Sequence, residues 1–290
     1  MRLRVAAVQL NSGDDKTANL AEAEAAIIHA AEAGARMVVL PELWTYLGPA
    51  SGNRANAEPV PGPATMRLAA LAYRHSLILH GGSLLELPDD APDDARPYNT
   101  AVLFDANGRQ IATYRKIHLF DAAPRDEAPP YQESATMSAG DTVVTAEVGG
   151  LRLGLATCYD LRFPELFRAL TLLGAQVLPL PAAFTRETGR DHWEPLIRAR
   201  AIENGCYIIA AAQVGSHPPR RVTHGHSMIV DPWGKVLAEA DGETPCIITA
   251  EVDTARITDV RRRIPALANR RPEVYRRALS VTVAANEETR

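Results

Sequence analysis

The sequence is poor in cysteine, lacks long apolar runs and carries no large excess of charge of either sign. Its 290 residues include three cysteines, Cys158, Cys206 and Cys246, and none belongs to a CxxC pair. This odd and scattered set argues against a disulfide framework or a zinc site, and it favours a reducing cytoplasm. At least one thiol must be free, because three thiols cannot all pair within one chain.

The missing features also limit the partners. No apolar stretch approaches the roughly 20 residues that a membrane-spanning helix needs. The apolar run within residues 1–15 soon breaks into polar residues, so it indicates a first strand and not a signal peptide. The net charge of −4 gives no sign of a nucleic-acid or membrane-surface partner. We therefore expect a small-molecule partner or a second copy of the chain.

Alternating segments predict a layered α/β fold in a single domain of residues 1–290. An alanine-rich helix at 14–35 lies between strand-like runs at 2–10 and 36–42. Further strands are predicted at 77–87, 98–116, 142–158, 176–184, 206–215, 224–240 and 246–252, and further helices at 64–76, 164–175 and 191–205. The DANG turn at 105–108 predicts a hairpin. Helices beside a mixed set of strands would cover the sheet faces.

Two segments stand outside this alternation. The basic, proline-containing tail at about 261–290 is predicted to form a strap, across the surface or onto a second subunit. Its arginines at 261–263 and 270–271 are expected to face solvent or an interface. The other segment is the loop at 121–138, and the sequence leaves open whether it closes over a substrate.

Cys158 lies in GLATCYDLRFPE, where a buried strand, a turn and a helix follow one another. A cysteine at a strand end is usually a small packed residue. Here it stands at the carboxyl end of a strand, where α/β sheets place ligand sites. The free N–H groups of a helix at 164–173 could supply a positive field that activates the thiol.

Two charged residues occupy similar positions. Glu42 follows an apolar strand in VVLPELW, and Lys116 ends another in ATYRKIHLF. Either residue alone could simply turn outward to solvent. Together with Cys158 they form a set of three reactive side chains at three strand ends.

This set resembles the nitrilase superfamily of carbon–nitrogen hydrolases. The family pattern of PE, RKxHL and CYDxRFPE stands unbroken and in order, and YQESATMSAG matches the loop that carries a second family glutamate, Glu133. The resemblance implies Glu42 as general base, Lys116 as oxyanion stabiliser and Cys158 as nucleophile. It further implies a four-layer α-β-β-α sandwich with mixed sheets, a homodimer or larger assembly, and no metal or organic cofactor.

The implied chemistry is hydrolysis of an amide through a thioester, with release of ammonia. Partial desolvation is expected to raise the proton affinity of Glu42, which suits a base. The backbone N–H of Tyr159 would join Lys116 in stabilising the negative oxygen of a tetrahedral intermediate.

Other residues are weaker candidates. Arg162 could form an ion pair with Glu165 or hold an acidic group of the substrate. Further possible substrate contacts are Phe184, Thr185, Arg186 and His192. A papain-type site with a histidine base lacks its local signature around Cys158; the candidate bases would be His118, His192, His224 and His226. His118 is instead expected to be structural, the HGHS pair at 224–227 to hold no metal, and Cys206 and Cys246 to be core residues.

Within the superfamily the chain most resembles deaminated-glutathione amidases and the neighbouring omega-amidases. The resemblance rests on HWEPLIRARAIENGCYIIAAAQ, HGHSMIVDPWG and RRPEVY. A nitrilase or an N-carbamoylase would use the same three residues, so these activities stay open. A protein of another class, one that kept the fold as a binding or scaffold protein and lost the chemistry, is the remaining alternative.

Overall fold

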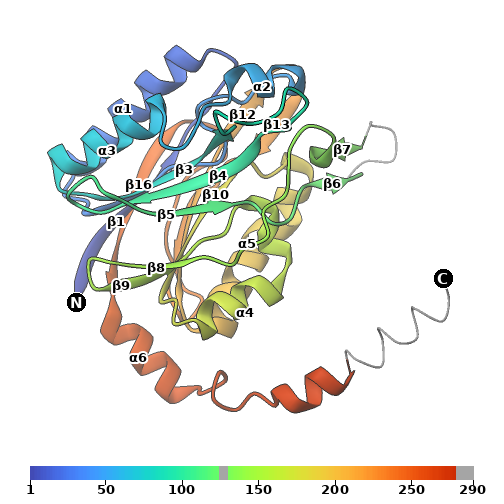
Figure 1. Cartoon of the computed structure of the whole chain (residues 1–290). Coiled ribbons are helices and arrows are strands. Elements are labelled where there is room, and N and C mark those ends of the chain that lie inside the picture. The colour runs from blue at the N-terminus through green and yellow to red at the C-terminus, as the bar shows by residue number, and fades with distance from the viewer. Residues whose placement is uncertain (124–129, 279–290) are drawn as a thin grey trace, which may run out of the picture.

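The computed structural model describes residues 1–123 and 130–278, which form two six-stranded sheets with helices outside them (Figure 1). The first sheet has the order β16-β1-β2-β3-β4-β5. Its strands are β16 (Cys246–Asp253), β1 (Arg2–Gln9), β2 (Met37–Val39), β3 (Ile78–Glu86), β4 (Tyr98–Phe104) and β5 (Gln110–Arg115). The pairs β1–β2 and β2–β3 are parallel and the others are antiparallel, so the sheet is mixed.

The second sheet repeats this design with the order β15-β14-β11-β10-β9-β8. Its strands are β15 (Val236–Glu239), β14 (Met228–Val230), β11 (Tyr207–Ala212), β10 (Val177–Ala182), β9 (Leu151–Gly154) and β8 (Thr145–Val148). Its central strands β9, β10 and β11 are parallel, and the remaining pairs are antiparallel.

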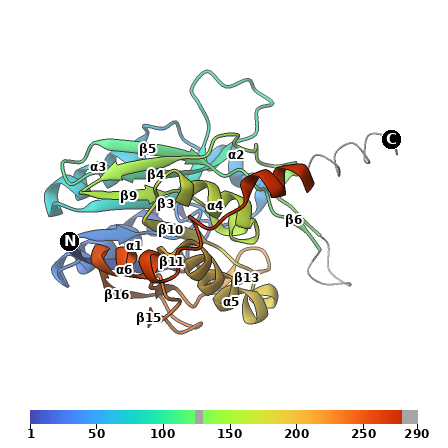
Figure 2. The same cartoon turned by 90° about the horizontal axis from the view of Figure 1, so that it is seen from below.

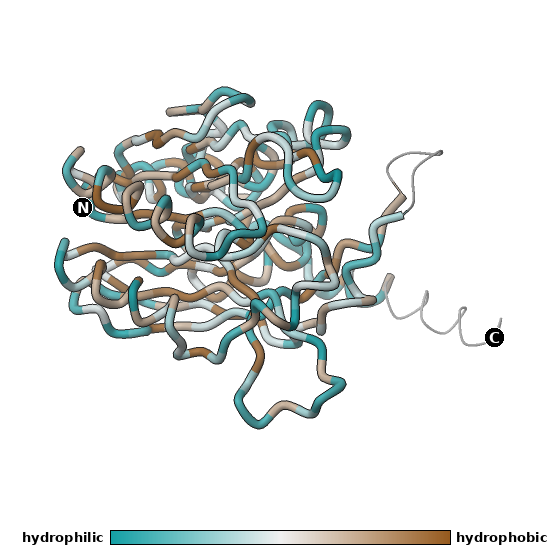
Figure 3. Tube along the Cα trace, turned by 90° about the horizontal axis from the view of Figure 1, so that it is seen from above, coloured by the Kyte–Doolittle hydropathy of each residue, from teal (hydrophilic) through white to brown (hydrophobic). Residues whose placement is uncertain are grey.

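The sheets pack face to face and form the two inner layers of a four-layer sandwich. Buried side chains of both sheets meet between them, among them Val5, Val39, Leu153 and Ile209. Helices α1 (Lys16–Glu32) and α3 (Pro63–His75) cover the outer face of the first sheet, and α4 (Pro164–Leu172) and α5 (Arg186–Asn204) cover the second. The layers are visible from below in Figure 2, and Figure 3 shows hydrophobic strands inside and hydrophilic loops outside. The predicted α-β-β-α sandwich is therefore confirmed.

Short elements surround one end of the sheets. Strands β6 (Asp121–Ala122) and β7 (Tyr131–Gln132) form a ribbon, and β12 (Val214–His217) and β13 (Arg221–His224) form a hairpin. Further short elements are η1 (Ala50–Gly52), α2 (Asn53–Asn56), η2 (Glu133–Ala135) and η3 (Cys158–Arg162). Helix α6 (Thr254–Arg263) follows β16 and begins beside the N-terminus, where Thr254 N donates to Met1 O (Figure 1). Residues 124–129 of the predicted loop lie outside the described part. In that part no helix is long and apolar enough to cross a membrane.

Several local predictions are confirmed and three need correction. The hairpin at 105–108 joins β4 to β5, and Cys206 is fully buried in the core. The helix predicted from 191 begins at Arg186. Cys246 is only half-buried, because β16 is the edge strand of its sheet.

The third correction concerns Arg261 at the end of α6. Its guanidinium donates to the carbonyl oxygens of Gly205 and Ala175 at 3.0 and 2.8 Å. It is therefore a fixed internal contact and not part of a solvated charge run, whereas Arg262 and Arg263 are exposed and pair with Asp259.

Candidate active site

The fold brings the three predicted side chains to one cavity. Glu42 follows β2, Lys116 follows β5 and Cys158 begins η3 after β9, so both sheets contribute. All three line a cavity of about 250 Å³, together with Glu133 from η2. Glu42, Lys116 and Cys158 are 3%, 2% and 7% exposed. An acid, an ammonium group and a thiol that lie far apart in the chain thus share one enclosed space.

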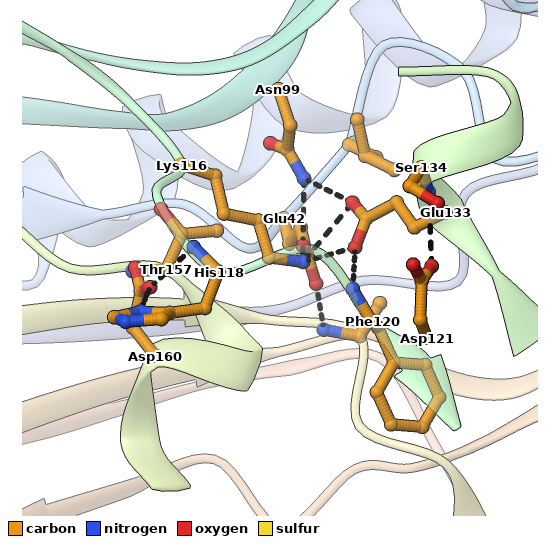
Figure 4. Close-up of polar contacts among 12 residues, drawn as sticks. Glu42, Asn99, Lys116, His118, Phe120, Asp121, Glu133, Ser134, Thr157 and Asp160 are labelled. Carbon is orange, nitrogen blue, oxygen red and sulfur yellow. Dashed lines mark hydrogen bonds and ion pairs between the residues drawn. The ribbon is translucent and has the colours of Figure 1, made fainter. Parts of the chain in front are cut away.

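Lys116 lies between two carboxylates (Figure 4). Its Nζ donates to Glu42 Oε1 at 2.9 Å and to Glu133 Oε2 at 2.9 Å. Asn99 Nδ2 donates to the same two residues, at 2.8 Å to Glu42 Oε1 and at 3.3 Å to Glu133 Oε1. The backbone N–H of Ala183 donates to Glu42 Oε2 at 2.7 Å. Both oxygens of Glu42 are therefore held, one by side chains of the first sheet and the other by the end of β10.

The ionisation of Glu42 differs from the prediction. Burial would raise its pKa, but the charge of Lys116 and hydrogen bonds with Cys158, Lys116 and Asn99 outweigh burial and leave the pKa below its usual value. The expected rise in proton affinity is therefore wrong, because it considered desolvation without the neighbouring ammonium.

The other two groups shift in the opposite direction. Burial opposes the charge on Lys116, yet Glu133 and Glu42 raise its pKa well above the usual value. Burial and Glu42 raise the pKa of the Cys158 thiol well above its usual value, and Lys116 only partly opposes them. The resting cluster therefore holds a carboxylate, an ammonium group and a neutral thiol. Because the net pKa of the Cys158 thiol is raised, its deprotonation requires a base.

A buried carboxylate shapes the turn that carries the nucleophile candidate. Cys158 has a φ of 48°, in the left-handed region that side chains with a Cβ rarely occupy. Asp160 stabilises this turn by accepting hydrogen bonds from Thr157 N at 2.7 Å and Tyr114 Oη at 2.6 Å. His118 Nδ1 lies 2.7 Å from Asp160 Oδ1, and the His118 ring stacks on Phe163. His118 thus has the predicted structural role.

Glu133 also connects the cluster to the outer wall of the cavity. Its Oε2 accepts a hydrogen bond from Phe120 N at 2.6 Å, and Ser134 N donates to Asp121 Oδ1 at 3.0 Å (Figure 4). These bonds tie η2 to the start of the β6–β7 ribbon. Pro130, Tyr131 and Gln132 of that ribbon line the cavity.

The predicted substrate contacts divide into two groups. Arg162, Phe184 and Thr185 line the cavity, whereas Arg186 and His192 are exposed and do not. Arg162 stacks over the Phe184 ring at 4.9 Å and lies 3.0 Å from His192 Nδ1 through its Nη1. In the described part of the chain Arg162 forms no ion pair with the exposed Glu165, so that alternative is wrong.

The histidine pair of HGHS provides no metal site. The rings of His224 and His226 stack with centroids 4.4 Å apart, and His226 Nδ1 lies 3.0 Å from Glu239 Oε1. Among residues 1–123 and 130–278 no group of three or more His, Cys, Asp or Glu side chains is arranged to hold a metal ion.

Sequence reasoning missed Asn99 and Arg221. Asn99 is fully buried in β4 and bridges Glu42 and Glu133. A polar residue early in the apolar run YNTAVLF was a usable signal, since a buried amide needs partners. Arg221 lines the cavity from β13. No pattern in its surroundings marked it, because its position depends on how the hairpin folds back.

Comparisons with known proteins agree with this geometry. The carbon–nitrogen hydrolase family model matches residues 4–262. A deaminated glutathione amidase from Synechocystis is 45% identical over 269 residues, covering 91% of this chain and 97% of the relative. Human omega-amidase NIT2 is 37% identical over 272 residues, covering 94% of this chain and 96% of the relative.

Solved structures lead to the same group of proteins. Saccharomyces cerevisiae Nit3, a member of branch 10 of the nitrilase superfamily, is similar with a TM-score of 0.81 and 33% identity, covering 91% of this chain and 94% of that one. A mutant amidase from Nesterenkonia sp. AN1 carries the acetamide moiety of fluoroacetamide covalently added at its active-site cysteine. Its TM-score is 0.77 at 28% identity, with 95% of this chain and 96% of that one covered.

Proposed function

The chain belongs to the carbon–nitrogen hydrolase family, whose members hydrolyse carbon–nitrogen bonds other than peptide bonds, and from this membership we propose that Cys158 is the nucleophile of an amidase. The observation that carries the proposal is the buried cluster in which Lys116 bridges Glu42 and Glu133 beside the Cys158 thiol. The covalent adduct at the active-site cysteine of the Nesterenkonia amidase supports the same role for the sulfur.

The first half of the reaction forms a thioester. Glu42 accepts the thiol proton while the sulfur of Cys158 attacks the amide carbon, because a thiol with a raised pKa is not ionised in advance. The electron pair of the C=O bond moves onto oxygen. When the tetrahedral intermediate collapses, the C–N bond breaks and Glu42 returns the proton to the leaving amine.

The second half hydrolyses the thioester. Water enters after the amine leaves, Glu42 accepts one of its protons, and the hydroxide attacks the thioester carbon. The C–S bond then breaks, the sulfur regains a proton through Glu42, and the carboxylic acid is released. Each cycle consumes one water and restores both the thiol and the carboxylate.

Lys116 and the backbone N–H of Tyr159 stabilise the negative oxygen in both halves. The raised pKa of Lys116 keeps it charged. If the two oxygens of Glu133 share one N–H and Glu42 takes a second, the third N–H of the ammonium group is free for the substrate oxygen. Removal of one such donor typically lowers the rate by about 10²–10³-fold.

The substrate best supported is deaminated glutathione, which is the activity named for the Synechocystis relative. This compound has a 2-oxo acid group on the acyl side of its γ-amide and cysteinylglycine as the leaving amine. Arg162 could bind the 2-oxo acid carboxylate, with Phe184 and Thr185 forming the wall beside it. The alternative is an omega-amidase acting on primary amides of 2-oxo acids, as the human relative is named. Only a primary amide releases ammonia.

The test is turnover of deaminated glutathione, 2-oxoglutaramate, a simple nitrile and an N-carbamoyl amino acid. The products to measure are 2-oxoglutarate for the first two compounds and ammonia for the last three. We expect the highest kcat/KM on deaminated glutathione, no turnover by Cys158→Ala, and an acyl-enzyme mass at Cys158 in the wild type. Turnover of none of the four, or unchanged turnover by Cys158→Ala, would defeat the amidase proposal and favour a binding protein.

We also propose a cytoplasmic homodimer or larger homo-oligomer in which residues 1–290 form one domain with a C-terminal strap from about 261. Ile202, Trp233 and Ile264 are 53%, 48% and 54% exposed and line an apolar groove between the end of α5 and the chain after α6. Such a patch is typical of a protein interface. Light scattering should give at least twice the monomer mass, and a stable monomer at micromolar concentration would contradict the proposed assembly.

A further inference from the structure

The charges that line the cavity are unevenly paired. Among the described residues the charged lining side chains are Glu42, Lys116, Glu133, Arg162 and Arg221. The first three bind one another through the ion pairs of Lys116. Neither arginine forms an ion pair with a described acidic residue. The cavity therefore presents two separate cations, because both carboxylates of its described lining are paired with Lys116.

The two arginines lie at different depths. Arg162 is four residues after Cys158 in η3, and its guanidinium lies over the rings of the buried Phe184 and of Tyr159, the residue next to Cys158. Arg221 is carried by β13 and lies over Tyr131 of β7, whose chain neighbours Pro130 and Gln132 line the cavity and are themselves exposed. Arg162 therefore belongs to the inner part of the cavity and Arg221 to its mouth.

Arg221 is also held in place. Its guanidinium carbon lies 5.8 Å from the centroid of the Tyr131 ring in β7, and the residue is half-buried. Stacking on an aromatic face orients the guanidinium and leaves its N–H groups available. A planar fork of donors in this state suits bidentate binding of a carboxylate.

We propose that Arg221 is a specificity-determining residue that binds a carboxylate on the leaving-amine side of the substrate. This inference rests on the proposed amidase function and narrows its substrate class to amides with an anionic group on both sides of the reacting carbonyl. The acyl-side anion meets Arg162 near the sulfur, and the second anion, several bonds beyond the nitrogen, meets Arg221 at the mouth. The glycine carboxylate of deaminated glutathione satisfies this requirement, whereas a primary amide has no group to place there.

The experiment compares Arg221→Gln with wild type on three substrates: deaminated glutathione, the same compound with its glycine carboxylate converted to a carboxamide, and 2-oxoglutaramate. We expect Arg221→Gln to lower kcat/KM for deaminated glutathione by about 10–100-fold, the effect of losing a charge-assisted hydrogen bond. Conversion to the carboxamide should lower kcat/KM by a similar factor in wild type and by less than about twofold in the variant. Arg221→Lys should fall between wild type and Arg221→Gln.

Arg220→Gln is the matched control, because it removes the same charge from the neighbouring exposed residue, which does not line the cavity. It should keep the wild-type preference between the acid and the carboxamide. An Arg221→Gln variant that loses equal activity on all three substrates would show a structural role and overturn the inference. Wild type that does not distinguish acid from carboxamide would also overturn it while leaving the amidase function intact. Absence of turnover on every substrate would instead reject the proposed function itself.

Discussion

Replacement of Lys116 by methionine should destabilise the fold in a pH-dependent way. Lys116 is 2% exposed and its ammonium group lies 2.9 Å from both Glu42 and Glu133. Methionine has a similar length but removes the charge, so two carboxylates that share the Asn99 amide would face each other without a cation. Breaking a buried ion pair in this way typically costs about 3–5 kcal/mol. We expect that loss in the free energy of unfolding, together with loss of turnover.

The pH dependence has a definite sign. In wild type Glu42 has a lowered pKa and Lys116 a raised one, so both stay charged from about pH 5 to about pH 8 and their contribution is constant. In Lys116→Met, burial and like-charge repulsion raise the pKa of one carboxyl group above its unfolded value of roughly 4.3. A carboxyl group whose pKa is higher in the folded state than in the unfolded state stabilises the fold at low pH. This stabilisation is lost as pH rises through the pKa of the folded state. The difference between wild type and variant should therefore widen toward pH 8.

Urea unfolding followed by circular dichroism at about pH 5 and about pH 8 measures this difference. Arg67→Met is the control, because Arg67 is 55% exposed and its ion pair with Glu24 lies at the surface. Such a pair is worth about 0–1 kcal/mol, and its loss should not depend on pH in this range. A Lys116→Met effect below about 1 kcal/mol, or one equal at both pH values, would refute the view that Lys116 neutralises a buried acid pair.

Three further predictions concern the buried Asp160 and His80 and the half-buried Arg261. Asp160→Asn replaces a carboxylate oxygen that accepts a hydrogen bond from Thr157 N. Thermal unfolding should therefore show a free energy of unfolding lower by about 1–3 kcal/mol, and activity assays should show a lower kcat. Unchanged values would contradict the role of Asp160 in the turn. Arg261→Gln should lower the free energy of unfolding, measured with urea, by about 1–3 kcal/mol. The control Arg262→Gln should change it by no more than about 0.5 kcal/mol. Equal effects of the two substitutions would mean that the Arg261 contacts contribute nothing to stability. His80 is buried, its ring nitrogens have no hydrogen-bond partner in the described part of the chain, and burial lowers its pKa to about 3. Because the unfolded chain takes up the proton first, the free energy of unfolding falls as pH drops below about 6.5, and His80→Leu should remove roughly 3 kcal/mol of that fall between pH 7 and pH 4. If the free energy of unfolding of His80→Leu fell between pH 7 and pH 4 as much as that of wild type, the last prediction would be contradicted.

The layers and the reactive cluster could be predicted from sequence because their signals are local. Apolar strand runs and alanine-rich or amphipathic helices require burial on defined faces, so a layered α/β fold follows from their order. The four-layer α-β-β-α arrangement was implied by the family resemblance. Glu42, Lys116 and Cys158 were recognisable because each stands at a strand end within a motif of the family pattern. Their meeting in one site was implied by that resemblance, and all three line one cavity.

Features that depend on distant contacts were not predictable. The start of α5 was misplaced because Gly189 resembles a helix breaker, yet a Cβ there would lie 2.3 Å from His224 Cγ, so close packing against β13 requires glycine inside the helix. The lowered pKa of Glu42 depends on an ammonium group that lies 74 positions further along the chain. Arg261 turns inward because α6 brings it to the carbonyl end of α5, where a cation is favoured.

The wall of the cavity is built in two parts that could evolve at different rates. Glu42, Lys116 and Cys158 are fixed by the ends of strands that also build the core, so almost any replacement there disturbs folding and chemistry together. The β6–β7 ribbon and the β12–β13 hairpin belong to neither large sheet. Their cavity-lining side chains Gln132 and Arg221 are exposed and half-buried, so these two can change at little cost to the framework. Directed evolution toward new amides should therefore begin with libraries at positions 130–132 and 221, where selection can explore leaving groups without rebuilding the reaction centre.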